Sequence, residues 1–412
     1  MNTIEVIEHQ KIKIGSKFDS DLKQITIEDA EYLRQLEIRQ GKKIFKWGHN
    51  NVSPQQWVGV ISTPNGTIEV LPKILDQTNL QQLRQILVHM LKVAYDVPVR
   101  KNISANLQNG TQGFLDILIS LFVMELEKQI RHGMYKAYQK HTENLNSIRG
   151  TINYPENIRK NALLKNKFVC RYSKFTEDNR LNQIIRFTLE YLSKVNGSHR
   201  NRTHIKRLIV NFDKVSLKKF NEHDVNQMIL DRNNLRFENT LNFCSLFLKG
   251  FALDLKSGEV QVNFMLFDMN LLFEKYIYKM FKKALKSGTV IYQYKKNHLL
   301  TRRSSSSKKI QLKPDLILSN SNKTIVLDTK WKNAKGFADE KDVYQINAYL
   351  DCIPNLDEGI LLYPKSTKND KIVDDYILNG IRNKSSIKIR TVDLLLSGEN
   401  PAFFSYLISL LK

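Results

Sequence analysis

Cysteine is scarce in this sequence, with 3 residues among 412: Cys170, Cys244 and Cys352. They lie far apart and form no Cys-x-x-Cys pair, which excludes a disulfide framework and a zinc site built from cysteine alone. The opening residues contain no long apolar stretch of the kind that forms a secretion signal. We therefore expect a protein of the reducing cytoplasm.

The sequence also lacks a long hydrophobic run. Its most apolar stretch, residues 114–126, is interrupted by Asp116 and is shorter than the roughly 20 residues that span a bilayer, so we expect no membrane partner. No G-x-x-x-x-G-K-[ST] or G-x-S-x-G string is present. We therefore expect the chain itself to bind no nucleotide, and any step driven by nucleotide hydrolysis would need another polypeptide.

Positive charge, by contrast, is in excess. The chain has 64 Lys and Arg against 41 Asp and Glu, for a formal net charge of +23. A surplus of this size is typical of proteins that bind a polyanion such as nucleic acid or an acidic membrane surface. The hydrophobic and charged fractions, 42% and 25%, are those of a globular protein and exclude disorder. The length predicts two or three domains.

Residues 1–103 mix strands with short helices, and their clearest element is a hairpin at 57–71. Two β-branched runs flank Asn65 and Gly66, and an Asn-Gly pair predicts a tight turn in which both residues have positive φ. A helix is expected over 79–95, where leucines recur at helical spacing. We interpret residues 1–103 as a β-rich N-terminal domain.

The pattern from 104 to 263 is mainly helical, and we interpret this range as a helical middle domain. Apolar residues recur at helical spacing most clearly at 114–138, 180–195 and 236–255. The string RGTINYPENIRKN (149–161) contains Gly, Pro and a cluster of polar residues, which predict a connection. No internal repeat is present.

Residues 264–412 change character and are expected to form a C-terminal α/β domain. We expect a helix, three strands, a second helix and a fourth strand, at 270–286, 289–294, 312–318, 324–330, 340–350 and 359–363. This αβββαβ order predicts a mixed sheet with a helix packed against it. The expected fold class is therefore multidomain α+β, with a β-rich N-terminal domain, a helical middle and a C-terminal α/β core.

The sharpest chemical signal lies in LKPDLILSNSNKTIVLDTKWK (312–332). Asp315 opens one apolar strand and Asp328 ends the next, so a turn at 319–323 would bring both carboxylates to the same end of a hairpin. Lys330 lies two residues after Asp328 and therefore on the same face of the strand. Two carboxylates form a hard-oxygen site for Mg²⁺ or Mn²⁺. A lysine beside them can orient or deprotonate an attacking water.

Short strings such as Pro-Asp and Asp-x-Lys are common, so their weight comes from their position on consecutive strands and from the cost of burying an unpaired carboxylate. Glu274, on the preceding helix, is a candidate third carboxylate; a solvated surface Glu is the alternative. Gln345 lies one helical turn before Tyr349, on the same face. It could donate to a DNA phosphate or to the water network, but an ordinary polar helix residue would look no different.

Positive charge is concentrated just before Asp315. Residues 275–313 contain twelve Lys or Arg and no Asp or Glu. This range leads directly to Asp315, so we interpret it as an arm that follows DNA phosphates rather than as a solvated face. The candidate DNA-binding residues are Lys295, Lys296, Arg302, Arg303, Lys308 and Lys309.

These residues resemble the PD-(D/E)XK nuclease superfamily, in which the matching features are Glu274, Pro314-Asp315, Asp328-Thr329-Lys330 and Gln345-x-x-x-Tyr349. More narrowly, the chain resembles the McrC family, the nuclease subunits of McrBC-type restriction systems for modified cytosine. The narrower resemblance rests on VGVISTPNGTIEVLPKI (58–74), RGTINYPENIRKN, FTEDNRLNQ (175–183) and FDMNLLFEKY (267–276). Thr329 stands where Ala is common in the superfamily, and its side chain should face away from the site.

The resemblance implies metal-dependent cleavage of double-stranded DNA that carries modified cytosine. It implies that Asp315, Asp328 and Glu274 bind the metal and that these residues, Lys330 and Gln345 are catalytic. It also implies a partner, a hexameric AAA+ GTPase of the McrB type, which would hydrolyse GTP and recognise the modified base. The β-rich N-terminal part would enter the pore of that ring and stimulate hydrolysis.

Two other functions stay open at this point: a catalytically idle DNA-binding adaptor of a motor NTPase, and a free-standing repair nuclease. The intact Asp315, Asp328 and Lys330 count against an idle adaptor, because a degenerate site usually loses one of its residues. The large helical middle region carries no recognised chemistry, which favours docking to another protein over independent action.

Overall fold

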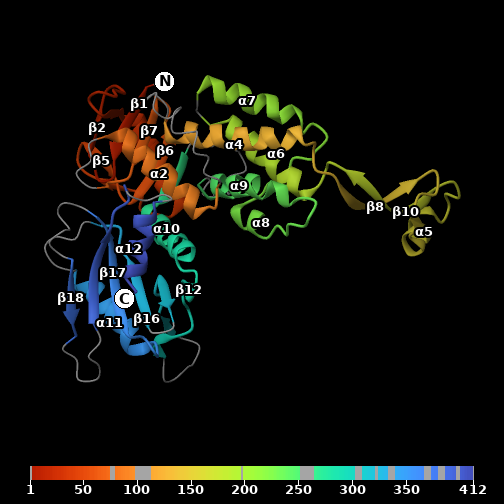
Figure 1. Cartoon of the computed structure of the whole chain (residues 1–412). Helices are drawn as coiled ribbons and strands as arrows, with labels where there is room; N and C mark the ends of the chain where they lie inside the picture. Colours follow the sequence, from red (N-terminus) through yellow and green to blue (C-terminus); the bar gives the residue numbers. More distant parts are fainter. Residues whose placement is uncertain are drawn as a thin grey trace. The chain divides into compact units, whose positions relative to one another are not determined.

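The structure, a computed structural model, is shown in Figure 1. It describes residues 2–74, 79–97, 113–195, 198–250, 264–301, 309–320, 323–332, 339–365, 373–378, 386–395 and 400–411. The chain forms two compact units. The composite unit contains Met1–Phe114 and Phe264–Lys412, and the middle unit contains Leu115–Asn263. The three-domain division stays a prediction, and its boundaries at 103 and 263 lie outside the described residues.

Two sheets form the N-terminal part of the composite unit, with strand orders β1-β7-β6-β11 and β3-β2-β5-β4. The bounds are β1 (Thr3–Ile7), β2 (Ile12–Gly15), β3 (Gln24–Thr26), α1 (Ile27–Gln40), β4 (Phe45–Trp47), β5 (Asn51–Pro54), β6 (Trp57–Ser62), β7 (Thr67–Leu71), α2 (Leu80–Ala94) and β11 (Phe264–Asp268). The predicted helix at 79–95 is confirmed as α2, capped by the Asn79 side chain.

Strand β11 belongs to the N-terminal sheet although it follows the whole middle unit in sequence. It pairs antiparallel with β6, from Phe264 opposite Ile61 to Asp268 opposite Trp57. Gly59 makes this pairing possible, because its φ is +146° and a Cβ at that position would lie 1.9 Å from a main-chain oxygen of β11. The N-terminal sheet therefore reaches its full width only with the residues that lead into the α/β core.

The predicted hairpin at 57–71 is present as β6 and β7, but the predicted turn is wrong. Neither Asn65 nor Gly66 has a positive φ, and the four-residue loop closes with the Thr63 N–H donating to Gly66 O at 2.8 Å. The Asn65 side chain donates instead to Asp29 Oδ1 at 3.2 Å, in the first turn of α1. A Cβ on Gly66 would lie 2.3 Å from the Phe18 ring. The Asn-Gly pair thus serves contacts with α1 and Phe18.

The predicted order of helix, three strands, helix and strand is present in the C-terminal part of the composite unit. The bounds are α10 (Met269–Ala284), β12 (Thr289–Tyr292), β13 (His298–Thr301), β14 (Lys309–Gln311), β15 (Leu316–Ser319), β16 (Thr324–Thr329), α11 (Glu340–Cys352), β17 (Glu358–Pro364), β18 (Asp374–Ile377), β19 (Ser386–Val392) and α12 (Pro401–Ser409). The β13–β14 hairpin, β18, β19 and α12 were not predicted.

The sheet of this α/β core is mixed, with strand order β12-β15-β16-β17-β19-β18. Its first three strands are antiparallel neighbours, and β16, β17 and β19 are parallel. Helix α11 packs on the sheet through Ile346, Tyr349 and Leu350, which share a buried cluster with Leu361 and Tyr363. The expected arrangement of a mixed sheet with a helix against it is therefore confirmed.

The middle unit is helical in its larger part, as expected, but a three-stranded sheet extends from it. Its bounds are α4 (Phe114–Arg131), β8 (Ala137–Leu145), β9 (Thr151–Ile152), α5 (Tyr154–Asn161), β10 (Phe168–Thr176), α6 (Arg180–Ser193), α7 (His199–Val210), α8 (Glu222–Asn226), η2 (Leu235–Phe237) and α9 (Glu238–Gly250). Within the described ranges, no helix combines the length and apolar character that crossing a membrane requires.

Two predictions for the middle region were wrong. The helix expected over 114–138 ends at Arg131, because Gly133 has a φ of +90° and the chain then enters β8. The connection expected at 149–161 contains β9 and α5. The helix expected over 236–255 is present as η2 and α9 up to Gly250, and residues 251–255 lie outside the described residues.

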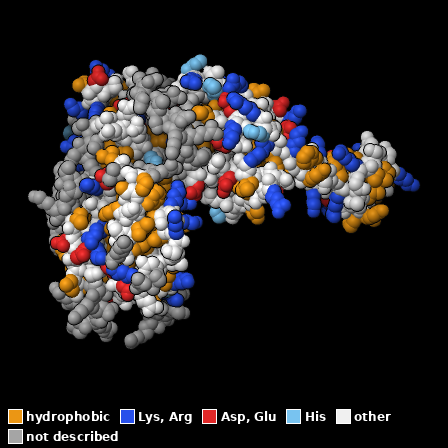
Figure 2. All heavy atoms as spheres, viewed as in Figure 1, with side chains coloured by type: hydrophobic (Ala, Val, Ile, Leu, Met, Phe, Trp, Pro, Cys, Tyr) orange, Lys and Arg blue, Asp and Glu red, His pale blue; other side chains and the backbone are white. Residues whose placement is uncertain are grey.

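Strands β8 and β10 form an arm that extends from the helices of the middle unit and carries α5 near its end (Figure 1). Residues near this end expose apolar side chains that Figure 2 shows as hydrophobic spheres. Leu163 is 95% exposed and Ile158 is 70% exposed. An exposed apolar group of this kind is typical of a surface that contacts another protein.

Candidate active site

The β15–β16 hairpin places the two predicted aspartates side by side. Its antiparallel register pairs Leu316 with Leu327, so Asp315, just before β15, lies next to Asp328, near the end of β16. Asp328 is 2% exposed. The proximity that the sequence predicted for these two carboxylates is confirmed.

Asp315 is held by the residue that follows Asp328. Its Oδ2 accepts hydrogen bonds from the N–H and the Oγ1 hydroxyl of Thr329, both at 2.7 Å. The expectation that the Thr329 side chain faces away from the site is therefore wrong. The antiparallel neighbour brings Asp315 within reach of both donors, and alanine at this position would supply only the main-chain one.

Glu274 is the third carboxylate, on helix α10. Its neighbours Phe273 and Ile277 are fully buried, and Glu274 itself is 7% exposed, which excludes the alternative of a solvated surface residue. The Gln293 side chain donates to Glu274 Oε1 at 3.0 Å. Its pKa is raised, first by burial and also by the charge of Asp328. Glu274 therefore lies within electrostatic reach of the aspartates.

Lys330 joins the aspartates to helix α11. Its Nζ lies 2.5 Å from Asp328 Oδ2 and donates to Gln345 Oε1 at 2.7 Å. Gln345 Nε2 donates in turn to the Tyr349 hydroxyl at 2.7 Å, as their shared helix face predicted. Gln345 thus contacts the lysine, a partner that its position on the helix does not predict.

Asp342 is a buried carboxylate at this site that the sequence reasoning missed. Its Oδ2 accepts from the Tyr363 hydroxyl at 2.8 Å and pairs with Lys332 Nζ at 2.7 Å, and its Oδ1 lies 3.7 Å from Lys330 Nζ. The sequence does contain a signal for Asp342: it precedes Gln345 by three residues on α11 and therefore lies on the same face of the helix.

Burial and mutual repulsion govern the charges of the paired aspartates. Burial, with the charge of Glu274, raises the pKa of Asp315 to about 6. Burial, with the charge of Asp315, raises the pKa of Asp328 to about 7. Burial alone would lower the pKa of Lys330, but Asp328 and Asp342 raise it above its ordinary value. Lys330 therefore stays protonated beside this group of carboxylates.

Three carboxylates with mutually raised pKa values have the donor chemistry of a hard divalent cation. Asp315, Asp328 and Glu274 supply the oxygens, and the Lys330 ammonium lies against Asp328. Among the described residues, no three His, Cys, Asp or Glu side chains are already gathered as ligands of one ion. The residues fit a divalent cation by chemistry and charge, and binding would require the carboxylates to draw together.

The predicted DNA-binding residues are only partly described. Lys295, Lys296 and Lys309 are exposed, on the loop before β13 and at the start of β14. The hairpin of β13 and β14 leads within a few residues to Asp315. Arg302, Arg303 and Lys308 lie outside the described residues.

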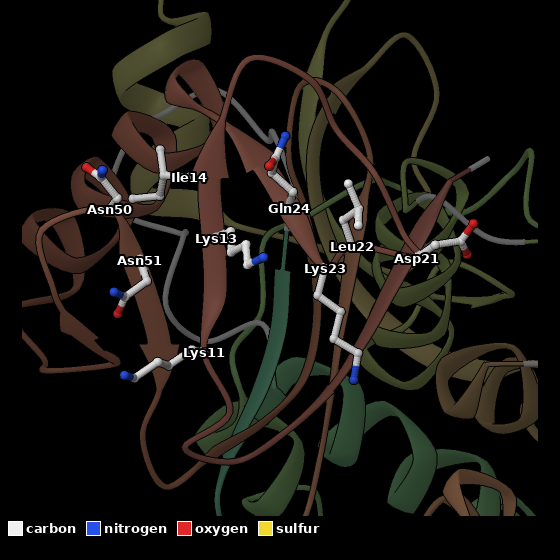
Figure 3. A pocket seen from close by; sticks show the side chains of 9 residues that line it. All are labelled: Lys11, Lys13, Ile14, Asp21, Leu22, Lys23, Gln24, Asn50 and Asn51. Atoms are coloured by element: carbon white, nitrogen blue, oxygen red, sulfur yellow. The ribbon is translucent and has the colours of Figure 1, made fainter.

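A separate recess of about 490 Å³ lies on the N-terminal part (Figure 3). Lysine and amide side chains dominate its lining, which consists of Lys11, Lys13, Ile14, Asp21, Leu22, Lys23, Gln24, Asn50 and Asn51. Asp21 is the single carboxylate among these lining residues and points away from the others in Figure 3. The recess therefore offers no pair of carboxylates comparable with Asp315 and Asp328.

Comparison with known proteins assigns the chain to a family. Residues 52–364 match the family described as "McrBC 5-methylcytosine restriction system component". This range covers most of the chain, including the N-terminal hairpin and all the site residues. The chain belongs to the McrC family.

A curated relative of this McrC-family chain is the type IV methyl-directed restriction enzyme EcoKMcrBC of Escherichia coli K12. The two are 23% identical over 288 residues, which are 64% of this chain and 79% of the relative. The chain also resembles, with a TM-score of 0.67 and 18% identity, a chain in an assembly of Thermococcus gammatolerans McrB AAA+ hexamers with bound McrC; 99% of this chain and 100% of that chain are covered.

A second solved structure, the McrBC complex of Thermococcus gammatolerans, matches with a TM-score of 0.51 and 20% identity over 69% of this chain and 89% of that one. At these identities the two solved structures support the fold of this McrC-family chain. The family match itself makes the chain a component of a McrBC-type restriction system.

Glu8, in the N-terminal part, is a further buried acid near this site. Its Oε2 accepts from the Lys73 N–H at 2.8 Å and from Trp331 Nε1 at 3.0 Å. Burial nevertheless raises the pKa of Glu8 to about 7, although the hydrogen bonds from Lys73 and Trp331 oppose this rise; the charge of Asp268 contributes to it. Glu8 is therefore a group whose protonation changes near neutral pH.

We expect Glu8 to stabilise the folded protein less as pH rises from about 4 to about 7. The unfolded chain releases this proton near its ordinary pKa of about 4.3, whereas the folded chain keeps it to a higher pH, so the contribution is complete below the lower value. Urea unfolding across this range should show a shallower loss of stability for Glu8→Gln than for wild type. Because Asp315 and Asp328 titrate in the same range, only the difference between the two proteins is diagnostic. If the free energy of unfolding changed equally with pH in wild type and Glu8→Gln, the prediction would be wrong.

Proposed function

We propose that this chain is the metal-dependent DNA endonuclease subunit of a modified-cytosine restriction system, with a PD-(D/E)XK core. The observation that carries the proposal is the proximity of Asp315, Asp328, Glu274 and Lys330, where β15 begins and β16 ends. Intact carboxylates and a lysine paired to one of them argue against an idle adaptor.

Each residue has a role that its contacts support. Asp315, Asp328 and Glu274 would hold Mg²⁺ or Mn²⁺, which would polarise the phosphodiester and neutralise charge on it. Lys330 would hold the attacking water and offset negative charge as the phosphorus is attacked. Gln345 accepts a hydrogen bond from Lys330 Nζ, so it would hold the ammonium in place to contact the attacking water. Thr329 would hold Asp315.

DNA would approach over the exposed lysines before the acidic strands. We expect replacement of Lys295, Lys296 and Lys309 with Ser to weaken DNA binding independently of sequence. The log–log salt dependence of binding should flatten, since each lost phosphate contact removes about 0.9 from its slope. The measurement is a fluorescence anisotropy titration at several salt concentrations.

The matched control replaces three exposed lysines of the N-terminal part, Lys42, Lys43 and Lys46, which changes the net charge equally. This control should leave the slope close to that of wild type. An equal flattening in both variants would show that net charge, and no local contact, determines binding.

We also propose that the chain binds a hexameric AAA+ GTPase of the McrB type. The sequence favours the N-terminal sheets as the docking part, and the arm with its apolar end is a second exposed surface of suitable character. A fragment that ends at residue 262 would remove β11 from the N-terminal sheet, so docking is best tested in the full chain.

One variant should lose DNA cleavage and still stimulate GTP hydrolysis by the partner. Asp328→Ala should stimulate GTP hydrolysis by the partner as strongly as wild type while it leaves DNA uncut, because Asp328 lies in the α/β core. Phosphate release from GTP and cleavage of methylated plasmid can be followed in the same mixture. Loss of stimulation in this variant would mean that the carboxylate site and the docking part cannot act separately.

A further inference from the structure

Trp331 links the segment that carries Lys330 to the N-terminal part of the chain. It directly follows Lys330, and its indole Nε1 donates to Glu8 Oε2 at 3.0 Å. The Lys73 N–H donates to the same oxygen at 2.8 Å. A single carboxylate oxygen of the N-terminal part thus holds the segment that carries Lys330.

The burial of Glu8 needs an explanation. Glu8 is 2% exposed, and its second oxygen, Oε1, is buried without a hydrogen-bond partner. A buried polar atom without a hydrogen-bond partner destabilises the folded state. A glutamine would keep the accepting oxygen, and an apolar residue would avoid the cost. The cost is consistent with a role for Glu8 that involves Trp331.

Both ends of this contact are firmly placed. The Glu8 N–H donates to Leu71 O at 3.0 Å, which continues the pairing of β1 with β7. On the other side, the Trp331 ring packs on Phe273, with 5.4 Å between ring centroids, and the Lys330 N–H donates to Leu362 O at 2.9 Å. Phe273 directly precedes Glu274, so the indole lies between the lysine segment and the helix of the third carboxylate.

We propose that Glu8 is a positioning residue for the nuclease site, and that its hydrogen bond to Trp331 couples the N-terminal sheet to Lys330. Glu8 touches neither metal nor DNA in this account and acts only through Trp331. The inference rests on the proposed nuclease function. It adds that a displacement of the N-terminal sheet is transmitted to the lysine, so a partner docked on that sheet can change the rate of cutting.

Three variants separate this role from a merely structural one. Glu8→Ala removes the acceptor, and Trp331→Phe removes the donor while keeping a ring against Phe273. Glu8→Gln keeps an oxygen that can accept from both Trp331 Nε1 and the Lys73 N–H. If the hydrogen bond matters, the glutamine variant should behave like wild type while the other two are slow.

The experiment measures kcat and KM for cleavage of methylated plasmid by the full chain, with the partner GTPase, GTP and Mg²⁺. We expect Glu8→Ala and Trp331→Phe to lower kcat about tenfold, the lower end of the range for residues that orient a metal site, with KM for DNA unchanged. Glu8→Gln should stay within about twofold of wild type.

The controls make each outcome decisive. If Glu8→Ala does not fold, as judged by its melting curve, Trp331→Phe alone decides. Equal kcat values for all variants, or a Glu8→Gln as slow as Glu8→Ala, would overturn the positioning role while leaving the nuclease proposal intact. If wild type cut no more DNA than Asp328→Ala, both the nuclease function and the positioning role of Glu8 would be overturned.

Discussion

Replacing Asp328 with Ala should lower the rate of DNA cleavage about a thousandfold or more. Loss of this carboxylate removes a metal ligand, and the metal supplies several kcal/mol of transition-state stabilisation, where each 1.36 kcal/mol is tenfold in rate. Asp315→Ala should have the same effect. Calorimetry should show weaker Mg²⁺ binding in both variants, and their circular dichroism should match that of wild type.

The matched control for the aspartate variants is Asp351→Ala, an exposed acid on α11 whose contact is with Asn347. It should cut like wild type. Unchanged Mg²⁺ affinity in both Asp315→Ala and Asp328→Ala would overturn the assignment of the metal ligands, even if cleavage were lost.

Lys330→Ala should cut at least about a hundredfold more slowly than wild type while it still binds DNA and metal. This is the usual scale for a positioned acid–base group. Single-turnover cleavage at saturating Mg²⁺ measures the rate of the cleavage step without a contribution from metal binding.

Lys332→Ala is the matched control, because Lys332 lies two residues further on and pairs with Asp339 and Asp342. It should retain cleavage within severalfold of wild type. If Lys330→Ala were equally mild, Lys330 would be a structural lysine that merely neutralises Asp328.

The α/β core and the aspartate pair were predictable because local signals agree there. The strands that follow Asp315 and precede Asp328 are short apolar runs separated by polar turn residues, which predict a hairpin. A hairpin has one register that buries both apolar runs, and it places the aspartates together. The Gln345–Tyr349 contact followed from helical spacing alone.

The arm and the Asn65 contacts were not predictable by the same reasoning. Strand β8 has no fully buried residue along its length, and its sequence, AYQKHTENL, lacks the alternation of apolar and polar residues by which a half-buried strand is recognised. Asn65 and Gly66 show the opposite case. Their pairing is a strong local signal for a tight turn, but in the structure they contact residues distant in sequence, Asp29 and Phe18.

The partners of Thr329 and Trp331 depend on long-range pairing. Thr329 was expected to face away because alternate residues of one strand point to opposite sides, but Asp315 on the neighbouring strand reaches both its donors. The Glu8–Trp331 contact joins residues 323 positions apart in the sequence. It exists because β1, β7, β6 and β11 bring the N-terminal part against the α/β core, and no local pattern encodes that order.

The most direct test is a cleavage assay of the purified full-length chain on methylated and unmethylated plasmid, with partner GTPase, GTP and Mg²⁺ omitted one at a time. We predict efficient cutting only of methylated DNA and only in the complete mixture, with none in the Asp328→Ala variant. Efficient cutting by the chain with Mg²⁺ alone, unaffected by partner or GTP, would contradict the account and identify a free-standing nuclease.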